Sequence, residues 1–113
     1  MDESRGVRSA VRAKALIGAG RIATLQDDFI RAEALCREGL ALYRELGDRR
    51  GSATSLSSLG YAALMRSTYA EARVLLEEAL SLFREVGDTG GCASALNILA
   101  SVLFIKASMH ERI

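Results

Sequence analysis

Apolar side chains recur along the chain with the three- and four-residue spacing of a helix face. Residues 53–65 carry this spacing in Leu56, Leu59 and Ala63, and residues 68–86 repeat it. Ala, Leu, Arg and Glu dominate the composition, and these are strong helix formers, so no strand is needed. The pattern predicts an all-α chain of antiparallel helical hairpins, with five helices at residues 7–25, 28–46, 49–65, 68–86 and 89–107.

Short polar segments separate the predicted helices. Each long helix ends in a Gly-Asp pair, at Gly47-Asp48 and at Gly87-Asp88. The glycine can adopt the left-handed conformation that ends a helix, and the aspartate can cap the next one. Within each hairpin, a side-chain oxygen is expected to accept from the first turn of the second helix. The candidates are Asp27 or Asp28 in the first hairpin and the hydroxyl in Arg66-Ser67-Thr68 in the second.

The chain matches itself when it is shifted by 40 residues. The segment ALYRELGDRRGSA at 41–53 aligns without a gap with SLFREVGDTGGCA at 81–93, and Gly20 falls on Gly60 in the same register. Self-similarity at such a period is typical of stacked helical repeats. We expect one domain, residues 1–113, that holds two full units and half of a third.

Composition and charge narrow the classes of partner. The net charge is +1, and the mildly basic stretch of Arg5, Arg8, Arg12 and Lys14 is interpreted as a solvated helix face, so no nucleic-acid partner is expected. Two cysteines are too few to staple a secreted scaffold. No run is expected to approach the roughly 20 apolar residues of a membrane span, and no signal peptide is recognised. The predicted location is therefore the cytoplasm, without a membrane partner.

The residues that carry catalysis in other proteins do not form a set here. His110 is the single histidine, so a metal site or a histidine-based triad would need residues from another chain. Cys36 is expected to be a buried, inert thiol, whereas Cys92, near a helix start, could have a lowered pKa. Gly90-Gly91 lacks the Lys-Ser/Thr and the preceding strand of a phosphate loop. We predict no enzyme activity, no cofactor and no metal.

The spacing of large and small residues resembles the tetratricopeptide repeat. The first helix of a unit has large, large, small and further apolar positions at Leu56, Leu59, Gly60 and Ala63. In the second helix, the small–large–small positions are taken by residues 72, 76 and 79. The other units repeat these positions as Leu16, Ala19, Gly20, Ala23, Ala32, Cys36 and Gly39, and as Leu96, Leu99, Ala100 and Leu103. The resemblance implies an α-α superhelix that binds proteins.

Two departures from the family pattern carry information. The period is 40 residues in place of 34, and no proline follows the second helix. The added phrases LYRELGD and LFREVGD look like a long-helix variant found in tandem arrays of bacterial signalling ATPases and transcription activators. The resemblance therefore implies either an independent protein–protein interaction module, acting as a scaffold or adaptor, or a regulatory sensor segment of such a larger protein.

The family commonly binds a peptide or helix on the surface formed by the first helices of the hairpins. The alternative is that these positions are no more than solvated helix faces. The family's carboxylate clamp is not reproduced, because its slots hold Ile17, Arg21, Asn97 and Ser101. The predicted partner groove consists of Lys14, Ile17, Arg21, Thr54, Ser57, Tyr61, Ser94, Asn97 and Ser101.

The last predicted helix is apolar nearly all round, as a helix buried on several sides would be. Its second-helix partner is expected to be missing, and exposed apolar side chains would forgo about 1.5–3 kcal/mol each. This predicts self-association as a two-fold homodimer, through this helix and the exposed side of the predicted helix at 68–86. The alternative is a fragment whose continuation covers this face; the Met1 start mildly favours a complete product. The predicted self-association residues are Leu96, Leu99, Val102, Leu103, Phe104 and Ile105.

Overall fold

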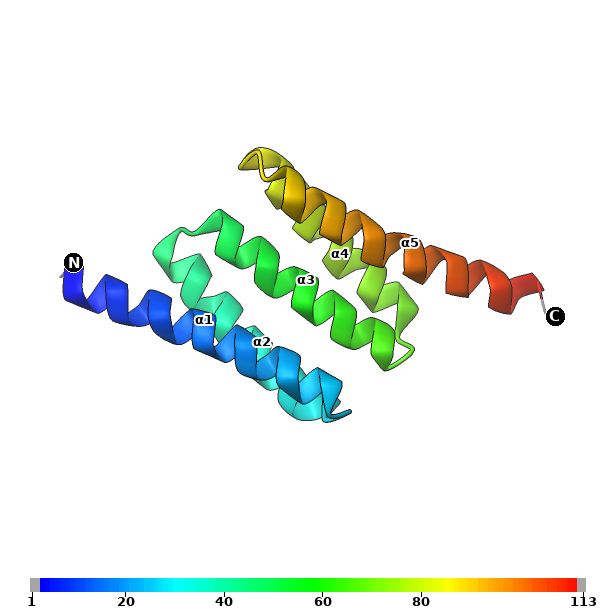
Figure 1. Ribbon diagram of the computed structural model, residues 1–113, viewed down its shortest axis with the longest axis horizontal. Coiled ribbons are helices and arrows are strands. Elements are labelled where there is room, and N and C mark those ends of the chain that lie inside the picture. Colours follow the sequence, from blue (N-terminus) through cyan, green and yellow to red (C-terminus); the bar gives the residue numbers. More distant parts are fainter. Residues whose placement is uncertain (1–2, 112–113) are drawn as a thin grey trace.

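Five helices follow one another through the chain, as the hydrophobic pattern predicts. The computed structural model describes residues 3–111, and the side chains of residues 3–109 (Figure 1). No strand is present in this part of the chain, which confirms the all-α prediction. The helices are α1 (Glu3–Leu25), α2 (Phe29–Leu46), α3 (Arg49–Met65), α4 (Tyr69–Glu85) and α5 (Thr89–Glu111).

The first and last helices are longer than the spacing indicated. Helix α1 begins at Glu3 and not at residue 7, and α5 continues to Glu111 and not to residue 107. Both extra segments project beyond the stacked body at opposite ends of the molecule (Figure 1). The pattern missed them because a helix end without a neighbour has no buried face to impose periodicity.

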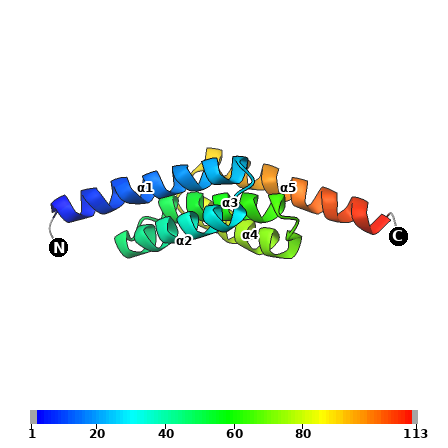
Figure 2. The same cartoon turned by 90° about the horizontal axis from the view of Figure 1, so that it is seen from below.

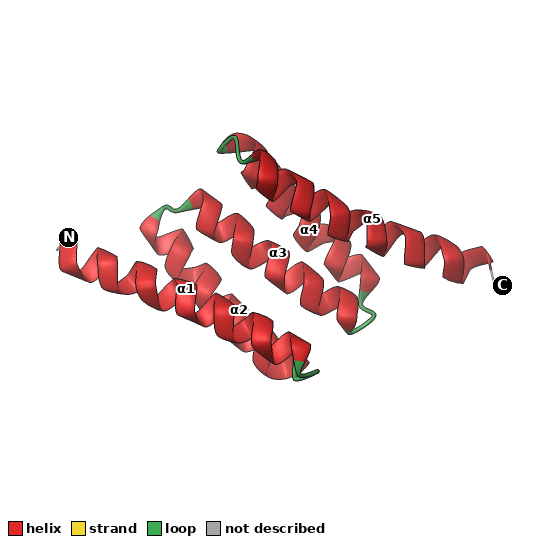
Figure 3. Cartoon of the chain, in the orientation of Figure 1, coloured by secondary structure: helices red, strands yellow, loops and turns green. Residues whose placement is uncertain are grey.

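The Gly-Asp turns adopt the predicted geometry. Gly47 and Gly87 have φ angles of 70° and 71°, in the left-handed region. The Asp48 carboxylate then accepts a 2.8 Å hydrogen bond from the Gly51 N–H, as Asp88 does from Gly91. One dipeptide therefore ends one helix and caps the next, in the short loops drawn in green in Figure 3.

The turns inside the two hairpins follow a different pattern. Asp28 caps α2, with its carboxylate accepting from the Arg31 N–H at 3.3 Å. Thr68 occupies the corresponding cap position of α4, but the predicted hydroxyl cap is wrong. Its Oγ1 donates backward to the Ala63 carbonyl at 2.9 Å and makes no bond to the first turn of α4. Asp27 and Ser67 complete these turns with positive φ angles.

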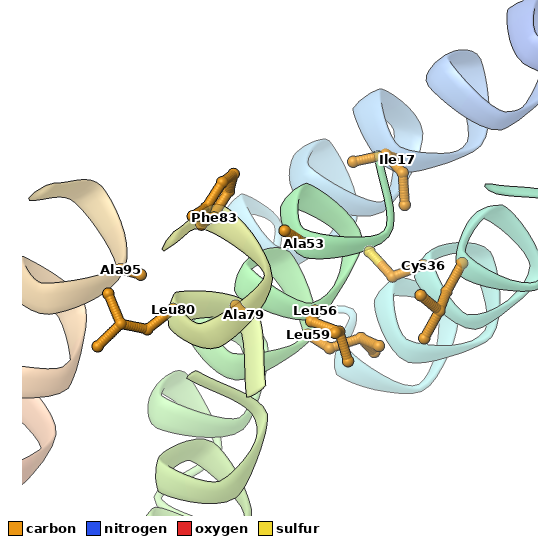
Figure 4. Close-up of a cluster of buried hydrophobic side chains, with 10 residues drawn as sticks. Ile17, Cys36, Ala53, Leu56, Leu59, Ala79, Leu80, Phe83 and Ala95 are labelled. Atoms are coloured by element: carbon orange, nitrogen blue, oxygen red, sulfur yellow. The ribbon is translucent and has the colours of Figure 1, made fainter. Parts of the chain in front are cut away.

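The helices form two layers. Helices α1, α3 and α5 lie in one layer, and α2 and α4 in the other (Figure 2). Helix α3 contacts all four of the other helices. Buried side chains from every helix meet around it, among them Leu56, Leu59 and Phe83 (Figure 4). Each hairpin stacks on the next because neither could bury its apolar faces alone.

Glycines allow the two helices of a hairpin to approach closely. A Cβ on Gly60 would lie 2.7 Å from Leu76 Cγ, and one on Gly20 would lie 2.4 Å from Cys36 Sγ. Both distances are well inside van der Waals contact, so a larger residue would push α4 or α2 away. These are the small positions of the repeat pattern, and the structure gives their physical reason.

Candidate functional site

Helices α1, α3 and α5 present one continuous hollowed face. A cavity of about 280 Å³ lies between them and is open to solvent. The Tyr61 ring, Leu25 and Ile98 supply its apolar wall, and Arg21 supplies a cation. The remaining lining residues are hydroxyl side chains: Thr24, Ser57, Ser58 and Ser94.

A second cavity, of about 480 Å³, adjoins the first along α1 and α3. Arg21 borders both cavities, so they form one elongated depression, which we name the α1/α3/α5 groove. Thr54 belongs to the second cavity, together with Lys14 and Arg50. The volumes fall within the range of small ligand sites, but the elongated form suits an extended segment better.

The charge in the groove is predominantly positive. Lys14 and Arg21 are exposed and form no ion pair with any residue that the structure describes. Arg50 is held by Asp88, with Nε 3.3 Å from Oδ2. The nearby Asp48 carboxylate is occupied as the cap of α3. Two cations that form no ion pair among the described residues therefore face solvent along α1, and Asp48 is the one acid among the residues that line the two cavities.

The structure brings together most, but not all, of the predicted groove residues. Ile17 borders the second cavity, but it is only 4% exposed and belongs to the core. Asn97 and Ser101 are exposed on α5 and border neither cavity. The residues that do line the groove are Lys14, Arg21, Thr54, Ser57, Tyr61 and Ser94.

Several lining positions were missed by the sequence interpretation, among them Leu25, Ile98 and Thr24. Leu25 follows Arg21 by one helical turn, and Ile98 follows Ser94 by one turn. Helical spacing alone would have placed these two on the groove face. Thr24 is buried, and its hydroxyl donates to the Gly20 carbonyl, so it shapes the floor and is not free to bind.

Ion pairs join the hairpins outside the groove. Glu33 on α2 accepts from Arg37 on the same helix at 3.0 Å and from Arg66, the residue that follows α3, at 2.8 Å. Arg37 also reaches Glu71 on α4 at 3.5 Å. The hydrogen bond from Arg37, with the charges of Arg37 and Arg66, holds the pKa of Glu33 below its ordinary value.

The two thiols lie in different surroundings, and both are free. Cys36 is 1% exposed, and desolvation raises its pKa to about 11, only partly offset by the charge of Arg21. Cys92 is partly buried against the core. The prediction that Cys36 is buried is therefore confirmed, and its low reactivity stays a prediction. The side chain of His110 lies outside the described residues.

Only one side of α5 is covered. Val102 is fully buried, and Leu99 and Ile105 pack against the same cluster on α3 and α4. Val102 is among the predicted self-association residues, but it faces the chain's own core and is not available to a second copy. Leu96 and Leu103 are 44% and 43% exposed, and Phe104 is 73% exposed. The uncovered side therefore carries three of the six residues predicted for self-association.

Helix α5 is also unusual in overall polarity. Its segment Thr89–Met109 is long and apolar enough, by length and composition alone, to cross a membrane, with a mean hydropathy of 1.6. The prediction that no run approaches such a span is wrong by this measure. Core helices of soluble proteins meet the same criterion, but here only 11% of the segment is buried.

The repeat geometry of the chain agrees with a known protein family. Stacked hairpins with a 40-residue register define a helical-repeat protein. The profile of the tetratricopeptide repeat matches residues 11–85, well over half of the chain. The chain belongs to the tetratricopeptide repeat family. No curated protein matches it. Repeats of this family generally mediate protein–protein interaction and are typically not catalytic.

Proposed function

We propose that this chain is a protein–protein interaction module whose α1/α3/α5 groove binds a peptide or helix of a partner protein. The observation that carries the proposal is the meeting of two cavities at Arg21, with hydroxyl, aromatic and cationic side chains facing solvent. A row of hydrogen-bonding groups beside an apolar wall suits an extended segment that alternates polar and apolar side chains.

The side chains of the groove favour a particular ligand chemistry. Lys14 and Arg21 have no acidic partner among the described residues, so a carboxylate of the ligand would supply one. Tyr61, Leu25 and Ile98 offer an apolar surface beside Arg21. The proposed ligand is a segment with an acidic residue next to a large apolar one. A net charge of +1 and largely paired arginines support a protein ligand over a nucleic acid.

A phage-displayed library of random dodecapeptides, selected on the purified chain, tests this ligand chemistry. We expect the selected peptides to be enriched in Asp or Glu beside Leu, Phe, Tyr or Trp. The affinity for the selected peptides, measured by fluorescence polarisation, should fall roughly tenfold or more in Arg21→Glu. The substitution replaces a charge-assisted hydrogen bond to the ligand carboxylate with a repulsion between two negative charges.

Arg84→Glu is the matched control for charge. Arg84 is exposed on α4, outside both cavities, and the substitution makes the same change in net charge. Peptide binding should be unchanged in this variant. Selection of peptides without acidic enrichment, or equal loss in both variants, would contradict the groove proposal.

We propose in addition that the chain self-associates as a homodimer through the uncovered side of α5. This proposal is supported by the exposed apolar side chains of Leu96, Leu103 and Phe104, because their burial would be favourable. Light scattering after gel filtration, over a hundredfold range of concentration, measures the mass. A monomer at every concentration would exclude the dimer without affecting the groove proposal.

The proposed location is the cytoplasm, which the two free thiols support.

A second candidate function is that of a regulatory sensor segment within a larger signalling ATPase or transcription activator. The 40-residue spacing, with its long second helix, is the observation that favours it. A genomic reading frame that joins this segment to an ATPase or DNA-binding domain would support this candidate. A reading frame confined to these residues would leave the independent module.

A further inference from the structure

The exposed side of α5 corresponds to a side of α3 that is buried. In the 40-residue register, Ala93 and Leu96 match Ala53 and Leu56, which are 0% and 1% exposed. Leu103 and Phe104 match two further buried residues, at 63 and 64. All four α5 residues are exposed. With Ala100 and Ala107, also exposed, they form what we name the α5 stripe: Ala93, Leu96, Ala100, Leu103, Phe104 and Ala107.

Helix α4 is what covers the matching positions of α3. Gly60 of α3 lies against Leu76 of α4, and Ala63 lies in one cluster with Leu76 and Ala72. The α5 stripe is therefore the surface against which the second helix of a hairpin would pack. No helix in the described residues occupies it, and α5 forms an edge of the array (Figure 1).

The stripe does not have the shape that receives a second helix of the repeat's own type. At the position of Gly20 and Gly60, where an added Cβ would overlap the opposite helix, α5 has Ala100. Where the other hairpins bury Ala23 and Ala63, α5 has Leu103. An occupant must therefore leave more room near Ala100 and Leu103 than α2 or α4 leaves.

Most of the stripe is symmetric about Ala100; the exception is Leu103, whose counterpart on the other side of Ala100 is Asn97. Counting outward in both directions gives leucine at 96 and phenylalanine at 104, then alanine at 93 and at 107. In an antiparallel pair of these helices, Ala100 would face its own copy, and Leu96 would face Phe104 of the other. Small residues would lie where the helix axes cross, and large ones where the axes diverge.

We infer that the occupant of the α5 stripe is α5 of a second copy, antiparallel and crossing at Ala100. This inference rests on the proposed self-association and specifies its geometry. On the opposite side of the same helix, Val102, Leu99 and Ile105 pack into the chain's own core. With the stripe paired, α5 would therefore be covered on both sides. Between Thr89 and Met109 the only charged residue is Lys106, so two copies can meet without like charges facing each other.

The area that this contact offers predicts a weak dimer. A helix of this length extends about 34 Å, and one helix pair covers less than the roughly 800 Å² per partner of a standard interface. We expect monomer and dimer to exchange within the micromolar-to-millimolar range, so that the average mass changes with concentration.

Cysteine cross-linking tests the geometry directly. In a Cys92→Ala background, Ala100→Cys should form an interchain disulfide under mild oxidation, because the residue faces itself across the two-fold axis. Cys36 is too buried to interfere. Ala41→Cys, at an exposed position on α2, is the control and should stay monomeric on a non-reducing gel.

A second pair of variants decides the orientation. Ala93→Cys and Ala107→Cys, mixed and treated with a short bis-maleimide, should cross-link to each other. Each alone should not, because in an antiparallel pair the two copies of residue 93 lie about 21 Å apart along the axis. Cross-linking of Ala93→Cys to itself, without the mixed product, would indicate parallel helices and overturn the inference.

The remaining outcomes separate the inference from the proposed function. A dimer in light scattering that neither cross-links at Ala100 nor dissociates in Leu96→Asp would retain self-association and overturn the α5 pairing. A monomer at every concentration would overturn both. Co-sedimentation of the monomer with phosphatidylcholine vesicles would overturn the pairing as well, since a lipid surface would then occupy the stripe. Peptide binding in the groove is measured independently of all three.

Discussion

Gly91 and Phe83 pack so closely that the glycine is required. A Cβ on Gly91 would lie 2.3 Å from Cδ1 of the Phe83 ring. Forty residues earlier, Gly51 has the same relationship to the ring of Tyr43, also at 2.3 Å. The aromatic residue near the end of each second helix therefore lies over the first turn of the next hairpin. This contact fixes how one hairpin stacks on the next.

Substitution of Gly91 by alanine should destabilise the chain. The added methyl would force the buried Phe83 ring out of place, and overpacking of this kind costs about 1–3 kcal/mol. Gly90→Ala is the neighbouring control, because its Cβ would meet nothing closer than Asp88 Oδ1 at 3.6 Å. Urea denaturation followed by circular dichroism measures both, and Gly90→Ala should be neutral or slightly stabilising. Equal effects in the two variants would contradict the ring contact.

Glycine at position 67 should stabilise the chain. Ser67 has a φ of 66°, a left-handed conformation that costs a non-glycine residue about 1–2 kcal/mol. Ser67→Gly removes part of this cost, although glycine also makes the unfolded chain more flexible, so we expect a gain below about 1 kcal/mol. Gly47→Ser makes the reverse change at a φ of 70° and should be destabilising. Thermal unfolding of the two variants should shift the Tm in opposite directions.

The turns between and within the hairpins show which parts of the fold could be predicted from the sequence and which could not. Gly-Asp was sufficient to predict the turns at Gly47 and Gly87, because the glycine sets its own backbone angles and the aspartate bonds the N–H three residues later. Thr68 was misjudged, since its hydroxyl had two acceptable partners within one turn of the chain and donates to Ala63. The sequence around a turn predicts its geometry only when each polar side chain has a single possible hydrogen-bond partner there.

The prediction for helix α5 failed for a different reason. Its residues are apolar on nearly every side, so periodicity could not identify the covered side. Val102 corresponds to Ala62 in the 40-residue register, and both are buried. Leu96 corresponds to the buried Leu56 but is exposed, because no described helix packs on that side. Which side of an apolar helix is covered depends on its neighbours, and for the groove the same holds for Leu25 and Ile98.

The ion pairs of Glu33 should make stability depend on acid pH. Its pKa is lowered in the folded chain, chiefly by the Arg37 hydrogen bond, so its contribution is complete above the ordinary value of 4.5. That contribution is lost as the pH falls through the folded pKa. The Tm difference between wild type and Glu33→Gln should therefore narrow as the pH is lowered from 7 to 3. Glu45→Gln is the control, because it removes an exposed acid that forms no ion pair among the described residues, and it should show no such narrowing.

The two cysteines should differ in their reaction with Ellman's reagent. Cys36 is 1% exposed, and its pKa of about 11 leaves little thiolate at pH 8, so it should react only when the hairpin opens. Cys92 is partly exposed near the start of α5 and should react first. Cys92→Ala should abolish the fast phase, and Cys36→Ala the slow one, and urea should merge the two rates. A fast phase that survives Cys92→Ala would mean that the first hairpin opens readily, contrary to the tight contact between Cys36 and Gly20.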